Sequence, residues 1–147
     1  YCCSLFGGDI FRMLIPFLEL NVRFRCLSVT PKDSANKLSG SIPGVRLFTE
    51  TLTRFNTLKE FQCGGQLCDN DVEVLIRALA CHFGLTKIDL GENDVGGRTI
   101  AALAALFTNP NFPLEGLILR RCSLDDEGVP ILADALARNN TIRKLHL

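Results

Sequence analysis

Residues 85–95 of this 147-residue chain read LTKIDLGENDV. The apolar side chains of Ile88 and Leu90 alternate with polar ones, and this period of two is typical of a β-strand with one buried face. Asn93 and Val95 follow in a segment whose glycine and asparagine indicate a turn. We therefore expect a short strand that leads directly into a turn.

The same spacing of apolar side chains recurs along the chain. Residues 114–124 read LEGLILRRCSL, with Cys122 at the place of Asn93. A degenerate copy begins at Leu58, and the start of another begins at Ile142. Because the copies begin at residues 58, 85, 114 and 142, their interval is nearly constant, which indicates an internal repeat.

The segments between these strands predict helices. Residues 72–79 and 100–107 carry apolar side chains at the spacing that places them on one helical face. Aspartate and asparagine at 69–71, and acidic residues at 125–127, predict caps at the starts of two helices. A strand followed by a helix, repeated, predicts an α/β fold with a parallel sheet and helices on its outside.

Composition restricts the class of protein. Hydrophobic residues make up 47% of the chain, and 16 basic side chains balance 16 acidic ones. This excludes a disordered tail and argues against a nucleic-acid binder, which would carry a basic surplus. No apolar run reaches the roughly 18 residues of a membrane helix. We therefore expect a soluble globular chain with no nucleic-acid or membrane partner.

Cysteine usage indicates the compartment of the protein, and the chain ends indicate that it is part of a longer one. The seven cysteines are odd in number, which favours free thiols in a reducing compartment such as the cytoplasm over a closed disulfide framework. The chain starts at Tyr1 rather than at a methionine and stops within a repeat. We therefore interpret it as a fragment of a longer protein, and we expect the isolated chain to aggregate or dimerise through its uncovered terminal repeats.

With these repeats, the sequence resembles leucine-rich repeats of the long, ribonuclease-inhibitor-like class. That class includes ribonuclease inhibitor, the sensor region of NOD-like receptors and the Ran GTPase-activating protein. The resemblance covers residues 44–147 well, and residues 109–124 are especially similar to vertebrate-type members. It implies a right-handed solenoid, a segment of a horseshoe, with the parallel sheet on its concave face. Residues 1–43 fit as a degenerate N-terminal repeat with a loop insertion, so that residues 1–147 form a single solenoid domain.

The resemblance also implies a structural role for the turn after each strand. This repeat class uses Asn or Cys there to hydrogen-bond the turn backbone, and unpaired buried backbone groups would cost about 1–3 kcal/mol each. Asn93 and Cys122 occupy this place, and Gln66 substitutes for them in the degenerate copy. We expect these three residues to form a ladder of structural turn contacts.

Candidate residues for chemistry are few. Cys63, Cys68, Cys81 and His82 invite a zinc interpretation, but the repeat already explains both Cys63 and Cys68 as small apolar side chains. The sequence has no phosphate-binding loop and no evident pairing of a nucleophile with a base. We therefore expect no metal, no cofactor and no catalytic residues.

The outward positions of the strands are the candidate binding surface. Glu60, Lys87, Gly116 and Lys144 are predicted to stack as one row, and Gln62, Asp89, Ile118 and His146 as another. Acidic side chains gather in the earlier copies and basic ones in the later copies, and this mixture favours a folded protein as partner. The alternative is a solvated face whose lateral ion pairs have little energetic value. The predicted binding set is Glu60, Gln62, Lys87, Asp89, Glu92, Ile118, Arg120, Arg121, Lys144 and His146.

These observations predict a protein–protein interaction module rather than an enzyme, with Ile118 and Arg120 as anchors. Resemblance leaves open a NOD-like sensor region, an inhibitor or a scaffold. A second hypothesis is a GTPase-activating protein resembling the Ran regulator, although the acidic tail of that family is absent from this sequence. A third is a purely structural segment.

Overall fold

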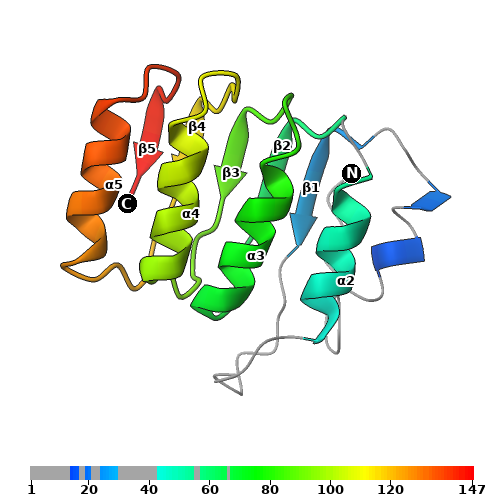
Figure 1. Cartoon of the computed structure of the whole chain (residues 1–147). Coiled ribbons are helices and arrows are strands. Elements are labelled where there is room, and N and C mark those ends of the chain that lie inside the picture. Colours follow the sequence, from blue (N-terminus) through cyan, green and yellow to red (C-terminus); the bar gives the residue numbers. More distant parts are fainter. Residues whose placement is uncertain (1–13, 17–18, 21–23, 30–42, 55–56, 66) are drawn as a thin grey trace.

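The computed structural model describes residues 14–16, 19–20, 24–29, 43–54, 57–65 and 67–147. Strands and helices alternate along these residues (Figure 1). Their order is β1 (Cys26–Val29), α2 (Pro43–Leu52), β2 (Glu60–Cys63), α3 (Asp69–Leu79), β3 (Lys87–Asp89), α4 (Gly97–Phe107), β4 (Gly116–Ile118), α5 (Gly128–Ala137) and β5 (Lys144–His146). The fold is α/β, as the repeating strand–helix pattern predicts, and is consistent with a leucine-rich-repeat architecture.

The five strands form one parallel sheet whose order in space is their order in the sequence. Helices α2 to α5 all cover the same face of this sheet and lie side by side (Figure 1). We call the other sheet face the open face. Each of the strands β1 to β4 is followed by a helix on the same side of the sheet, which brings the next strand into parallel register with the last.

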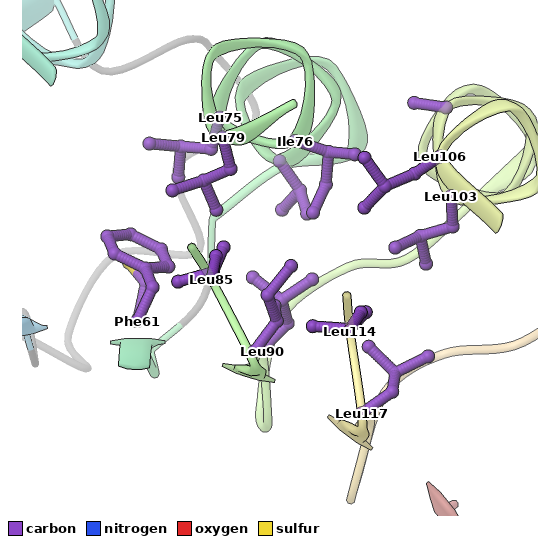
Figure 2. Packing of buried hydrophobic residues seen from close by; sticks show 14 of the residues in the cluster. Phe61, Leu75, Ile76, Leu79, Leu85, Leu90, Leu103, Leu106, Leu114 and Leu117 are labelled. Carbon is purple, nitrogen blue, oxygen red and sulfur yellow. The ribbon is translucent and has the colours of Figure 1, made fainter. Parts of the chain in front are cut away.

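The core lies between the sheet and the helices (Figure 2). Phe61, Ile88 and Leu117 occupy equivalent register positions on neighbouring strands, and each is almost fully buried. Leu75, Ile76 and Leu79 of α3 meet this row from above, which confirms the predicted apolar face of residues 72–79. Burying one such side chain contributes about 2 kcal/mol, so the repeated contacts dominate the stability of the fold.

Packing weakens at the last repeat. Leu145 occupies the same register as Leu117 but is 38% exposed. Val129 and Ile131 of α5 are also exposed, because no further element covers that side of the helix in the described part of the chain. These side chains are the apolar surface from which we expect self-association.

The acidic residues predicted at 69–71 lie in the first turn of α3, but Asp69 caps a different helix from the expected one. Cys68 is the N-cap residue of α3, and its side chain makes no capping hydrogen bond. Instead, Asp69 caps α4 of the next repeat: its Oδ1 accepts hydrogen bonds from the N–H groups of Gly96 (2.9 Å) and Thr99 (3.0 Å). Gly96 leaves room for this contact, since a Cβ there would lie 3.0 Å from the Asp69 carboxylate. The physical reason is that the parallel repeats bring the starts of successive helices together.

Two sequence predictions fall on residues outside the described ranges. Of the predicted loop insertion, residues 30–42 are not described, and Gln66 is not described either. Within the predicted degenerate N-terminal repeat, residues 26–29 form β1, which pairs with β2. Along the described residues, no helix is both long enough and apolar enough to cross a lipid bilayer.

Candidate binding surface on the open face of the sheet

Asn93 ties two successive turns together beneath the edge of the open face. Its side chain is buried, and its Nδ2 donates hydrogen bonds to the carbonyl oxygens of Cys63 (2.7 Å) and Leu90 (2.8 Å). Its Oδ1 accepts one from the Leu67 N–H at 3.0 Å. A single amide thereby satisfies three backbone groups from two repeats. The groups of Cys63 and Leu67 belong to the preceding repeat, and that of Leu90 belongs to the same repeat as Asn93.

Cys122 occupies the equivalent place one repeat later. Its Sγ lies 3.3 Å from the Leu90 carbonyl oxygen, so the thiol donates to the preceding repeat as Asn93 does. Burial raises the pKa of the Cys122 thiol, which keeps the S–H proton that this contact requires. The thiol is a weaker donor than an amide and offers the turn fewer contacts.

The register stacks the outward side chains of the strands into two rows across the open face. The first row contains Glu60, Lys87, Gly116 and Lys144, and the second contains Gln62, Asp89, Ile118 and His146. In the first row, Lys87 Nζ lies 3.7 Å from Glu60 Oε2, and both side chains are about half exposed. Gly116 provides no side chain of its own and lies against the stem of Lys87.

A cleft of about 520 Å³ lies at the carboxyl ends of β2, β3 and β4. It brings together five of the predicted binding residues, Gln62, Asp89, Glu92, Arg120 and Arg121. The other five, Glu60, Lys87, Ile118, Lys144 and His146, lie on the strands themselves and do not line this cleft.

Two glycines at outward positions, which the predicted binding set does not include, also line the cleft. Gly64 and Gly91 follow β2 and β3, and neither adds a side chain to its wall. A Cβ at Gly91 would lie 3.3 Å from both the Arg120 carbonyl oxygen and Asp89 Oδ1. The Gly91 N–H donates to Asp89 Oδ1 at 3.0 Å, which orients that carboxylate. Glycine therefore keeps backbone at the cleft surface and leaves the space above it open.

The rim of the cleft has an unusual backbone conformation. Gly65, Glu92 and Arg121 occupy the same place in successive turns, and all have positive φ, of 115°, 67° and 55°. This left-handed conformation costs a non-glycine residue roughly 1–2 kcal/mol. Glu92 and Arg121 form an ion pair of 3.1 Å between repeats, yet their side chains are 60% and 82% exposed. An exposed pair of this kind contributes about 0–1 kcal/mol, which does not offset the strain of two such residues.

The cysteines and histidine considered for zinc do not form a cluster. Among the described residues, no group of three or more His, Cys, Asp or Glu side chains could hold a metal ion. Cys63 is completely buried in the core, and burial raises the pKa of its thiol to about 12. Cys68, Cys81 and Cys122 are free thiols, as is Cys63.

His82 is buried in the loop between α3 and β3. Neither ring nitrogen meets hydrogen-bonding geometry with a described group. Burial lowers the pKa of His82, and the nearby backbone carbonyl of Leu52 opposes this shift only in part. The imidazole is therefore neutral at neutral pH.

Comparisons with known proteins extend these observations. No protein-family model matches the chain. It is 28% identical, over 151 aligned residues, to the NACHT, LRR and PYD domains-containing protein 9C of Mus musculus. That alignment covers 100% of this chain and 14% of the mouse protein. This similarity supports the leucine-rich-repeat interpretation and the resemblance to NOD-like receptors.

A solved structure has a similar fold. Leiomodin-1 Actin-Binding Site 2 (ABS2) superimposes with a TM-score of 0.71 at 19% sequence identity, covering 95% of this chain and 80% of that one. At this level of identity the likeness concerns the fold.

Proposed function

We propose that this chain is a segment of a right-handed leucine-rich-repeat solenoid of the ribonuclease-inhibitor-like class, and that it binds a partner protein. The open face of the sheet is the concave, binding face in this proposal. The similarity to the mouse NACHT, LRR and PYD domains-containing protein supports a protein-interaction role. The five strands in sequential order, with helices α2 to α5 on one side, support the solenoid.

The observation that carries the proposal is the cleft at the carboxyl ends of β2 to β4. Parallel sheets are normally covered on both faces, so an accessible face calls for a function. Apart from Leu147 and two glycines, the side chains that line this cleft are charged or polar, and Glu92 and Arg121 are kept in a strained backbone conformation. Stability does not explain them, because the exposed ion pairs on this face are worth at most about 1 kcal/mol each.

The proposed role is binding without catalysis, in a reducing compartment such as the cytoplasm. The free thiols of Cys63, Cys68, Cys81 and Cys122 support that location, since disulfides form readily in oxidising compartments. The mixture of acidic and basic side chains on the open face favours a folded protein over nucleic acid as the partner.

Site-specific photocrosslinking tests this proposal. A photoreactive amino acid is placed at Gln62 or His146 on the open face, and at Arg46 or Ala133 on the exposed helix side. Cell extracts are then irradiated in the presence and absence of excess unlabelled chain. We expect saturable crosslinks to the same partner from Gln62 and His146 and none from the helix side. Crosslinks of equal yield from both sides would contradict a binding role for the open face.

A further inference from the structure

The turn after β4 places two arginines shortly before a serine. Residues 119–124 read LRRCSL, and Arg120 and Arg121 are the only two consecutive arginines of the chain. Ser123 stands three residues after the first of them, and Leu124 follows it. Protein kinases distinguish their substrates by the charges around the accepting hydroxyl. A kinase with an acidic peptide groove pairs with arginines at the second and third positions before a serine, which is the spacing found here.

The structure presents this serine and both arginines to solvent. Ser123, Arg120 and Arg121 are exposed, and Ser123 lies between β4 and α5 in a stretch without helix or strand. Among the described residues, no group forms a hydrogen bond with the Ser123 hydroxyl, and no carboxylate lies within ion-pair distance of Arg120. Arg121 is paired with Glu92 but remains 82% exposed, so this weak contact can be exchanged for another.

The turn that carries the serine is held less firmly than its counterpart in the preceding repeat. There the Asn93 amide makes three hydrogen bonds of 2.7–3.0 Å to buried backbone groups. Here the Cys122 thiol, a weak donor, lies 3.3 Å from the Leu90 carbonyl oxygen. Docking in a kinase groove requires residues 120–124 to open locally, including Leu124, which packs against the core. The weak thiol contact lowers the cost of that opening.

The fold accepts negative charge at this place. Ser123 occupies the same position in its repeat as Asp94 in the preceding one, and Asp94 is exposed as well. A phosphoserine carries roughly −1.5 to −2 charges at pH 7. It would stand where the preceding repeat already has a carboxylate, and it would precede α5, whose amino-terminal end favours negative charge. We therefore expect the phosphorylated chain to stay folded.

The residues after the serine offer a competing pattern. Asp125, Asp126 and Glu127 would suit a kinase that selects acidic residues on that side. That side, however, is built into the start of α5: Asp125 Oδ1 accepts the Gly128 N–H at 2.6 Å, and Glu127, the N-cap residue, already has a helical backbone. A kinase that reads this side must unwind the start of the helix, so the geometry favours reading from the arginine side.

We propose that Ser123 is a phosphorylation site for an arginine-directed protein kinase. In the transfer, Ser123 Oγ forms a bond to the γ-phosphorus of the ATP that the kinase holds, while the bond from that phosphorus to the β–γ bridging oxygen breaks. The hydroxyl proton passes to a carboxylate base of the kinase, and ADP leaves. The inference does not depend on the proposed binding role of the open face.

Phosphorylation of the 147-residue chain by purified kinases tests the inference. The chain is incubated at low concentration with Mg-ATP and the catalytic subunit of cyclic-AMP-dependent protein kinase, which is arginine-directed, or with casein kinase 2, which is acid-directed. Mass spectrometry locates the phosphate. We expect the arginine-directed kinase to modify Ser123 and to show a higher kcat/KM than the acid-directed one. Arg120→Gln should lower this kcat/KM about tenfold, because one charge-assisted pair with the kinase is lost.

A matched serine controls for accessibility. Ser28 also stands three residues after an arginine, Arg25, but it lies within β1 and its hydroxyl donates to Gln62 at 3.2 Å. Ser123→Ala should abolish incorporation of phosphate, whereas Ser28→Ala should leave it unchanged. Circular dichroism confirms that each variant is folded.

Cys122→Asn tests the requirement for local opening. Its amide should hold the turn as Asn93 does and should lower kcat/KM on the folded chain about tenfold. The same substitution in a synthetic peptide of residues 117–128 should change little, because the peptide has no turn to open.

Several results would overturn the proposal. These are no incorporation in the folded chain, incorporation that survives Ser123→Ala, an unchanged rate in Arg120→Gln, or a higher kcat/KM with casein kinase 2. The crosslinks from Gln62 and His146 decide separately whether the open face binds a protein.

Discussion

Replacing Asn93 by alanine is expected to destabilise the chain by about 3–5 kcal/mol. The change removes an acceptor from the Leu67 N–H and two donors from the carbonyl oxygens of Cys63 and Leu90. All three of those residues are fully buried, so water does not easily replace the amide. The unpaired N–H costs about 1–3 kcal/mol, and each weakened carbonyl contact adds about 1 kcal/mol.

Urea unfolding followed by far-ultraviolet circular dichroism measures this loss at low protein concentration. Asn93→Cys reproduces the arrangement at Cys122, keeping one weak donor, and should fall between the native chain and Asn93→Ala. Asn140→Ala is the matched control, because Asn140 is exposed, and its loss should cost less than about 0.5 kcal/mol. If Asn93→Ala costs less than about 1 kcal/mol with an unchanged urea slope, the turn contacts do not hold the repeats together.

Three further changes probe other parts of the fold. Asp69→Ala should cost about 1–2 kcal/mol in urea unfolding because α4 loses its cap, whereas Asp126→Ala, at an exposed position, should change little; equal losses would refute the capping role. The pKa of His82 is lowered from 6.5 in the folded state, so the unfolded chain binds the proton more readily and stability should fall as pH decreases below about 6.5. In His82→Phe this part of the decline should disappear in unfolding curves recorded at pH 7 and pH 5.5, and an unchanged decline would assign it to other groups. The isolated chain should self-associate in light scattering through exposed Ile131, so Ile131→Lys should raise the monomer fraction more than Ala133→Lys, and equal fractions would contradict this.

The repeat architecture could be predicted because it depends on spacing. Ile88 and Leu117 match in sequence and also in the sheet, since a period of two fixes which side chains face the helices. The helical spacing of residues 72–79 fixes the buried face of α3 in the same way. The rows on the open face follow from the same rule, because parallel strands in constant register must stack equivalent positions.

The cap of α4 and the left-handed backbone at the rim of the cleft could not be predicted, because no local sequence pattern contains them. Asp69 stands at the start of its own helix, where a local rule assigns it to α3, yet its carboxylate reaches α4 across the repeat. The left-handed backbone at Glu92 and Arg121 contradicts their intrinsic preference, so propensity cannot find it. The one available signal was Gly65, which stands at the equivalent place of the degenerate copy.

Two repeats place different side chains beside the carboxyl end of the preceding helix. His82 and Asn139 occupy equivalent positions, each before the first apolar residue of the next strand. Asn139 Nδ2 donates to the carbonyl oxygen of Phe107, the last residue of α4, at 3.0 Å. His82 lies near the carbonyl of Leu52, the last residue of α2, although neither ring nitrogen meets hydrogen-bonding geometry there. A helix ends in carbonyl groups that lack a partner within the helix, and its dipole is negative there, so a side chain with an N–H group is favoured at this place. The amide of Asn139 donates its N–H without carrying a titratable group. Burial opposes protonation of the imidazole more strongly than the carbonyl favours it, so the place of His82 beside the end of α2 should be sensitive to acid, whereas the Asn139 contact should not be.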